Sequence, residues 1–184
     1  MRNRIRVVAG FAAGTAIAVL LAGPAMTVRA VEAWTAPNAA AADDTTITPP
    51  DLVARTPRGE LHNPYKDSDA TIVADGGRLF LGYGCNACHG DAGEGGMCPS
   101  LTDDLWIYGG DDDTLFRLVA DGTDVLQRHG YARHGKVNVV GEMPPFGGIV
   151  STSADLWKIL AFIRSKYRGD PGYKFGASPP PPGG

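Results

Sequence analysis

The feature that most constrains this chain is a C-x-x-C-H motif, formed by Cys85, Cys88 and His89. Two thiols three positions apart lie on one face of a helical turn, where they can bond to the two vinyl groups of a haem. The imidazole that follows is then carried under the iron as its proximal ligand. We therefore expect one covalent haem c, attached at Cys85 and Cys88 and ligated by His89.

A zinc or redox site is the alternative use of two cysteines at this spacing. Cys98 is the third cysteine of the chain and could supply one more zinc ligand, but His89 directly after Cys88 is badly placed to share that metal. If a haem uses Cys85 and Cys88, Cys98 is left as an odd thiol. We expect it to be a small buried residue behind the haem, with an intermolecular disulfide as the alternative.

The N-terminus has the parts of a secretory signal peptide, which we assign to residues 1–30. Three arginines precede the apolar run 7–21, and residues 28–30 offer small or slim side chains to a signal peptidase. Export agrees with haem attachment outside the cytoplasm, so we expect a periplasmic protein. An uncleaved membrane anchor is the competing interpretation, which glycines and Pro24 in the apolar stretch weaken.

The charge balance excludes some partners. Removing residues 1–30 takes away four arginines and no acid, which leaves 13 basic and 20 acidic side chains and a net charge near −7. Such a charge argues against nucleic acid and suggests steering toward a basic patch on a partner protein. Simple solubility is the alternative explanation of the same charge.

Composition divides the rest of the chain into three parts. Residues 31–66 are expected to form an extended arm, residues 67–170 a single domain, and residues 171–184 a Pro/Gly-rich tail. Helical spacing of apolar residues predicts a first helix over residues 70–83. The only alternation with period two, residues 137–140, is too short to found a sheet.

Two further helices are predicted from their capping residues and apolar stripes. Residues 111–113 can cap a short helix that Gly122 would stop, and Thr152 with Asp155 resembles a capping box that opens the last helix. The middle helix carries Leu115, Phe116, Leu118 and Val119, and the last carries Leu156, Ile159, Leu160 and Ile163. The expected fold is all-α, with few helices and long loops wrapped round a haem that completes the core.

An electron carrier needs a sixth iron ligand from the protein. The candidates in the exported chain are Met97, Met143, His62, His129 and His134. Met143 is preferred, because two prolines hold the backbone after it extended and rigid, and a His/Met pair raises the reduction potential. A histidine in its place would give a haem of lower potential, and Met143 as a core gap-filler is the other alternative.

Over residues 67–170 the chain resembles a class I cytochrome c. The run Cys98-Pro99-Ser100-Leu101 matches the family's G-P-x-L element, with Cys in place of Gly. The resemblance implies that the Pro99 carbonyl accepts a hydrogen bond from His89 and that Leu101 packs on the haem. It also implies that Gly76 and Phe80 cross the last helix near Trp157 and Ala161.

Several segments together resemble cytochrome c(L), the electron acceptor of pyrroloquinoline-quinone (PQQ) methanol dehydrogenases. They are residues 62–65, 105–109, 143–147, 155–157 and 161–164. The resemblance implies that Trp106 or Tyr108 hydrogen-bonds a haem propionate; an aromatic core residue is the alternative for either.

We therefore expect a one-electron carrier, not an enzyme. The resemblance implies a PQQ-dependent methanol or alcohol dehydrogenase as donor and a downstream cytochrome c or oxidase as recipient. Loops 90–96 and 147–148 are expected to ring the docking face. The alternatives are a generic class I carrier for another dehydrogenase, a peroxidase or ligand binder with an open sixth position, and a zinc-stabilised interaction module.

Overall fold

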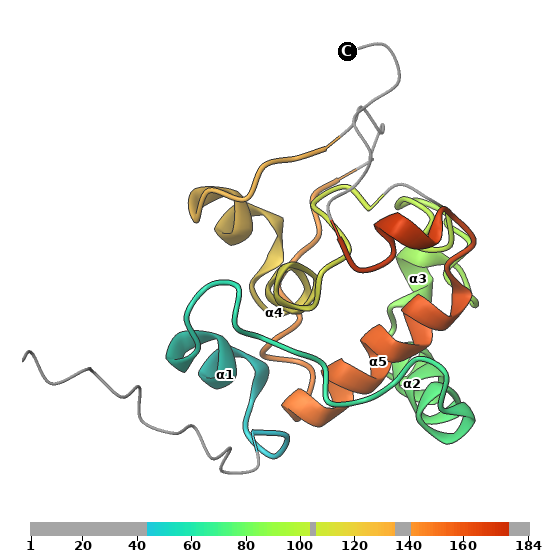
Figure 1. Cartoon of the computed structure of the whole chain (residues 1–184), viewed down its shortest axis with the longest axis horizontal. Helices are drawn as coiled ribbons and strands as arrows, with labels where there is room; N and C mark the ends of the chain where they lie inside the picture. Colours follow the sequence, from blue (N-terminus) through green and yellow to red (C-terminus); the bar gives the residue numbers. More distant parts are fainter. Residues whose placement is uncertain (1–43, 104–105, 135–140, 177–184) are drawn as a thin grey trace, which may run out of the picture. The chain divides into compact units, whose positions relative to one another are not determined.

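The computed structural model describes residues 44–103, 106–134 and 141–176, and within these ranges it is built from helices without any strand (Figure 1). Its elements are α1 (Pro49–Arg55), α2 (Ala70–Gly82), α3 (Asn86–His89), α4 (Asp112–Arg128), α5 (Ser153–Lys166) and the short 3-10 helix η1 (Pro171–Tyr173). The all-α expectation is confirmed for this part of the chain. The alternating residues 137–140 lie outside the described residues.

The main helix crossing joins α2 and α5, as expected from Gly76 and Phe80. A Cβ atom on Gly76 would lie 2.0 Å from the carbonyl oxygen of Lys158, so only glycine permits this approach. The Phe80 and Phe162 rings pack beside it with centroids 5.4 Å apart. The partners on α5 are Lys158 and Phe162, each one position after the Trp157 and Ala161 expected.

Helix α5 begins as predicted, but with a different set of cap contacts. The Asp155 N–H donates to the Thr152 hydroxyl at 3.2 Å. The Asp155 carboxylate does not complete a capping box; it accepts a hydrogen bond from the Tyr83 hydroxyl at 3.0 Å. Residues before α1 satisfy the other free amides of the first turn, with Ser153 N–H donating to the Ile47 carbonyl at 2.7 Å.

The expectation of an extended arm is wrong for residues 49–55, which form α1. Thr48 caps this helix by accepting from the Asp51 N–H, and two prolines occupy its first turn, where a missing N–H costs nothing. Leu52 is buried in the core with an exposed fraction of 3%, and Leu61, farther along the same segment, is buried at 4%. This N-terminal segment is therefore part of the folded unit.

Helix α4 starts at the predicted cap but runs farther than expected. The Asp111 carboxylate accepts from the Thr114 N–H at 2.8 Å. Gly122 interrupts the helix with φ 77° and ψ 170°, as a stop signal should, but the chain resumes helical geometry and continues to Arg128. The interruption at Gly122 was predicted correctly, but the helical residues 123–128 after it were not predicted.

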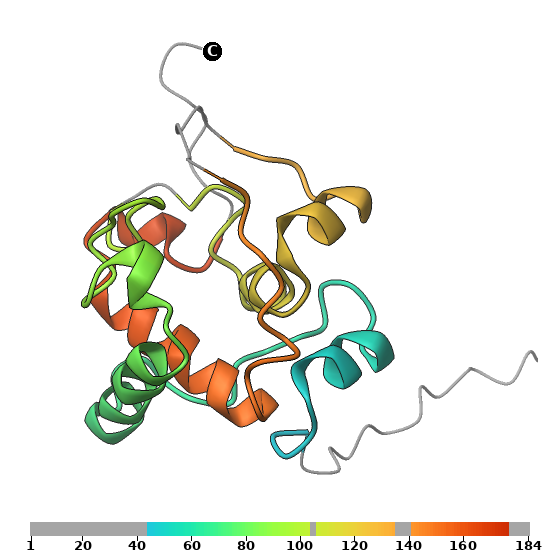
Figure 2. The same cartoon turned by 180° about the vertical axis from the view of Figure 1, so that it is seen from behind.

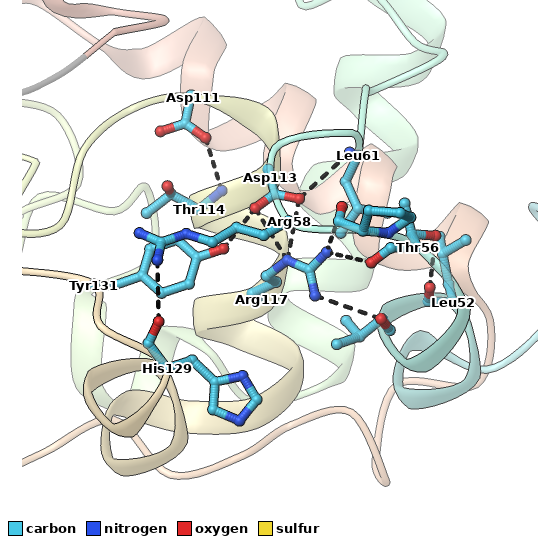
Figure 3. A network of polar contacts seen from close by, with 12 residues as sticks. Leu52, Thr56, Arg58, Leu61, Asp111, Asp113, Thr114, Arg117, His129 and Tyr131 are labelled. Carbon is cyan, nitrogen blue, oxygen red and sulfur yellow. Dashed lines mark hydrogen bonds and ion pairs between the residues drawn. The ribbon is translucent and has the colours of Figure 1, made fainter. Parts of the chain in front are cut away.

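A buried ionic network ties α4 to the N-terminal segment (Figure 3). The Arg117 Nε atom lies 3.0 Å from both carboxylate oxygens of Asp113. The Arg117 Nη2 atom donates to the carbonyls of both Thr56 and Pro57, at 2.7 and 3.1 Å, while the Tyr131 hydroxyl donates to Asp113 at 2.6 Å. Arg117 and Asp113 are only 7% and 4% exposed, so this charge pair is held inside the protein.

The segment after α5 also packs on the fold, although the sequence predicted a tail from residue 171. The Gly110 N–H donates to the Gly176 carbonyl at 2.7 Å, and Lys174 pairs with Asp67. The buried Arg164 guanidinium pairs with Asp112. Residues 177–184 lie outside the described residues. Among residues 44–103, 106–134 and 141–176, none of the helices has the length and apolar character of a membrane span.

Candidate functional site

One open cavity is lined by most of the residues that the sequence predicted to bind or contact a haem. The cavity is open to solvent, and its empty space, which includes the mouth, is about 1050 Å³. The apolar walls come from α2, α4 and α5: Phe80, Leu115, Leu118, Val119, Ile159, Leu160 and Ile163. Three of the four predicted stripe residues of α4 and of α5 thus line the cavity, whereas Phe116 and Leu156 are buried in the core without lining it.

The C-x-x-C-H motif forms the short helix α3 at one wall. Gly84, with φ 77°, ends α2: its N–H donates to the Leu81 carbonyl and the Cys85 N–H donates to the Phe80 carbonyl, both at 3.0 Å. The His89 N–H then donates to the Cys85 carbonyl at 3.1 Å, which forms the new turn of α3. Cys85 and His89 line the cavity, and Cys88 is half-buried on the same turn. Burial in these apolar surroundings raises the pKa of the Cys85 thiol to about 11.

The hydrogen bond expected between His89 and Pro99 is present. The His89 Nδ1 atom lies 3.0 Å from the Pro99 carbonyl oxygen. A carbonyl oxygen can only accept, so Nδ1 carries the proton and Nε2 keeps its lone pair for a metal. This hydrogen bond fixes the orientation of the imidazole ring and makes its Nε2 atom a more basic ligand for a metal.

Cys98 does not displace the Pro99 carbonyl, although Gly is usual at its position. The Cys98 N–H donates to the Cys88 carbonyl at 3.0 Å, which closes the loop after α3. Cys98 lines the cavity but is only half-buried, not fully buried as expected. Burial and a hydrogen bond with the neighbouring Cys88 thiol raise its pKa.

Among the candidate sixth ligands, Met143 lies on the cavity wall. It is half-buried and packs against the main core. Met97 is 60% exposed, and neither it nor the three histidines line the cavity. The His62 and His129 side chains are exposed, and His134 is half-buried.

The expected packing and propionate residues also lie at the cavity. Leu101, Trp106 and Tyr108 all line it, and both aromatic residues are buried. The Tyr108 hydroxyl accepts a hydrogen bond from Gln127 Nε2 at 2.6 Å and keeps its own proton to donate. Of the loops expected around the mouth, residue Gly147 is instead buried against Pro50 and the Ala120 carbonyl.

Several polar residues of the cavity were not anticipated. They are Ser100, Asp103, Thr123, Arg133 and Glu142. Thr123 directly follows Gly122, the glycine expected to stop the middle helix. No local pattern marks Thr123 as a cavity residue, because its contacts with Met143 span 20 residues of sequence.

The residues present fit a c-type haem. The cavity is apolar, and it has a thiol, an oriented imidazole and a thioether on its walls. Within residues 44–103, 106–134 and 141–176, no group of three or more His, Cys, Asp or Glu side chains could hold a metal ion. These ranges therefore contain no set of ligands for the alternative zinc site.

Comparison with known proteins gives relatives among oxidase subunits. The chain is 32% identical over 108 residues to the cbb3-type cytochrome c oxidase subunit CcoP of Cereibacter sphaeroides, covering 57% of this chain and 31% of that protein. It is 34% identical over 94 residues to the subunit FixP of Sinorhizobium medicae, covering 50% and 29%. The chain thus spans about a third of the length of these curated relatives.

A solved structure with a similar chain is cytochrome CL from Methylophaga aminisulfidivorans. The identity is 22% and the TM-score 0.45, over 66% of this chain and 77% of that one. The curated relatives support the broader expectation of a cytochrome c and give no specific support for a c(L) assignment.

The model of the family "Cytochrome C oxidase, cbb3-type, subunit III" matches residues 72–163, which is half of the chain. The match runs from α2 into α5 and includes the C-x-x-C-H motif and Met143. Proteins of this kind carry covalently bound c-type haem and transfer electrons. The chain therefore belongs to this cytochrome c family, whose members are electron-transfer proteins and not enzymes.

Proposed function

We propose that this protein is an exported one-electron carrier with a single haem c, bonded to Cys85 and Cys88 and held between His89 and Met143. The observation that supports the proposal most is that Cys85, His89 and Met143 line one apolar cavity while His89 Nδ1 donates to the Pro99 carbonyl. Bound there, the haem would supply the ferric–ferrous couple.

The protein's own residues set the conditions for that couple. The Pro99 carbonyl keeps the His89 ring in one tautomer and orientation. Met143 presents a soft thioether, which favours the ferrous state and raises the reduction potential relative to a second histidine. Buried Trp106 and Tyr108 are proposed to donate hydrogen bonds to the propionates, and Leu101 to pack on the haem face.

The compartment and domain limits are proposed from the sequence. Residues 1–30 act as a signal peptide that directs the protein to the periplasm. The carrier domain comprises residues 67–170 together with the N-terminal segment that packs against it, and residues after 176 form the Pro/Gly-rich end.

For the donor, we propose a PQQ-dependent methanol or alcohol dehydrogenase, with a downstream cytochrome c or oxidase as recipient. The c(L)-like segments support this donor, and the net charge near −7 of the exported chain favours docking on a basic surface. A second candidate is direct electron delivery within a cbb3-type oxidase system, which the CcoP and FixP relatives favour. A generic class I carrier for another dehydrogenase is the remaining alternative.

The haem proposal is tested on the mature protein from a host competent in cytochrome maturation. We expect a covalent haem stain on a denaturing gel, a Met–iron charge-transfer band in the ferric spectrum, and slow binding of carbon monoxide by the reduced protein. Rapid carbon monoxide binding at neutral pH would instead support the open-site alternative. Met143→His should stay folded with a lower potential, and an unchanged visible spectrum would show that Met143 is not a ligand.

The partner proposal is tested by stopped-flow kinetics. Reduction by a purified PQQ dehydrogenase and oxidation by a cbb3-type oxidase are measured with the same preparation. We expect the dehydrogenase reaction to be fast and to slow as salt is added, because docking is electrostatic. Slow reduction together with fast oxidation would favour the second candidate.

A further inference from the structure

The break in helix α4 holds the segment that carries Met143. In an uninterrupted helix, the Thr123 N–H would donate to the Val119 carbonyl four residues earlier. Here the Thr123 N–H donates to the Met143 carbonyl at 3.0 Å, and the Val119 carbonyl accepts from the Phe146 N–H at 2.8 Å. Gly122 therefore replaces helical hydrogen bonds with bonds to the segment before α5, which passes across α4 at this point (Figure 2).

Thr123 also binds this segment with its side chain. Its hydroxyl accepts from the Met143 N–H at 3.0 Å, so one residue satisfies both backbone groups of Met143. Thr123 is 3% exposed and lines the cavity beside Met143. A buried hydroxyl that binds the backbone on both sides of the Met143 Cα atom restricts the direction of its side chain.

The rest of the segment has little remaining freedom. Pro144 and Pro145 have fixed φ angles and no N–H to satisfy. The next two amides are already used, because Phe146 donates to Val119 and the Gly147 N–H donates to the Ala120 carbonyl at 2.9 Å.

The break must be a glycine for the segment to come this close. Gly122 has φ 77°, which residues with a side chain rarely adopt. A Cβ atom there would also lie 2.8 Å from the Pro145 nitrogen and 2.9 Å from the Met143 carbonyl oxygen.

We propose that Thr123 is a positioning residue for the sixth ligand: through its hydroxyl and its amide it holds Met143 so that the thioether is presented to the haem iron. This inference rests on the proposed role of Met143. It assigns the stability of the sulfur–iron bond partly to a residue that never touches the haem iron.

The test compares Thr123→Val with Thr123→Ser in the mature haem protein. Valine keeps the shape but removes the hydroxyl, so the Met143 N–H loses its partner whenever the segment is in place. We expect Thr123→Val to weaken the Met–iron charge-transfer band and to raise the ferric protein's affinity for imidazole at least about fivefold, the equivalent of one unmade buried hydrogen bond. Thr123→Ser, which keeps the hydroxyl, should restore both values.

The matched control is Thr114→Val, another buried threonine of α4, at its opposite end. It should leave imidazole affinity unchanged even if it lowers stability. Unchanged affinity in Thr123→Val, with the charge-transfer band intact, would overturn this inference and leave Met143 ligation standing. A wild-type protein without the band would instead refute Met143 ligation itself.

Amide hydrogen exchange on the wild-type protein tests the same contact without a variant, should Thr123→Val fail to fold. We expect the Met143 amide to exchange much more slowly than that of the exposed Glu142. Equally fast exchange at Met143 and Glu142 would refute the hydrogen bond on which the inference depends.

Discussion

Replacing Asp113 by asparagine should destabilise this protein more than any loss of a surface charge. The change removes the carboxylate that is paired with Arg117, a residue that is 7% exposed; in the described part of the chain the other hydrogen bonds of its guanidinium go to backbone carbonyls (Figure 3). Breaking one partner of a buried ion pair typically costs about 3–5 kcal/mol, because the other charge stays buried without compensation. Asparagine can still accept one hydrogen bond, so we expect about 3 kcal/mol.

A loss of about 3 kcal/mol is a large part of the 5–15 kcal/mol that typically separates folded from unfolded protein. For a domain of this size it corresponds to a fall in Tm of about 10 °C. The assay is equilibrium denaturation of the haem-loaded protein, followed by circular dichroism. The control is Asp44→Asn, because the Asp44–Arg55 pair is exposed on both sides and should contribute less than about 1 kcal/mol.

A double-mutant cycle isolates the pair. Arg117→Met together with Asp113→Asn removes both charges, so the double variant should lose clearly less stability than the two single losses added. Equal losses in Asp113→Asn and Asp44→Asn would refute the reasoning, since they would mean that the buried charge of Arg117 does not depend on Asp113.

Further predictions concern pH, the helix crossing and the odd thiol. Burial and the hydrogen bond to Asp113 raise the pKa of Tyr131 from 10.0 to about 12, so its contribution to stability is complete below pH 10 and lost as pH rises toward 12. Burial opposes ionisation of Asp113, but hydrogen bonds from Arg117 and Tyr131 outweigh burial and hold the pKa of Asp113 below 3.8. The ionised Asp113 therefore contributes to stability above pH 3.8, and this contribution is lost as pH falls through the lowered pKa. The free energy of unfolding, measured against pH for the wild type and for Tyr131→Phe, tests the contributions of Asp113 and Tyr131. Gly76→Ala should lower the free energy of unfolding by about 1–3 kcal/mol or more in denaturant melts. Gly82→Ala is the control and should not destabilise the protein, because no atom lies within 4 Å of its added Cβ. Equal stability of the two variants would contradict the close crossing of α2 and α5. Cys98→Ala should keep full haem loading and an unchanged monomer fraction on a non-reducing gel, and a wild-type dimer band that the variant lacks would indicate an intermolecular disulfide instead.

The parts of the fold that sequence predicts well are those set by local chemistry. The C-x-x-C-H turn, the Asp111 cap and the Thr152 cap each depend on residues within a few positions. Gly76 was found through resemblance to class I cytochromes c, and the close crossing of α2 and α5 explains why a glycine is needed there. Pro99 was found through resemblance, and its contact spans only ten residues.

The parts that sequence did not predict depend on distant partners. Thr48, two prolines and Asp51 do form a helix start, but the polar, Pro-containing composition around them favoured an extended arm. Arg117 lies among apolar residues with nothing local to mark it, because the carbonyls it binds are about 60 residues away. Thr123 acquires its role only where α4 breaks and the Met143 segment fills the gap.

The N-terminal segment has a practical consequence for anyone who wishes to make a smaller version of this protein. The haem motif and the resemblance to known carriers both suggest a minimal fragment that begins near residue 67. Such a fragment would strip Leu52 and Leu61 from the core and leave the Arg117 guanidinium facing water where the Thr56 carbonyl had been. A shortened gene should therefore start no later than residue 44, so that the first turn of α5 also keeps the carbonyls that cap it.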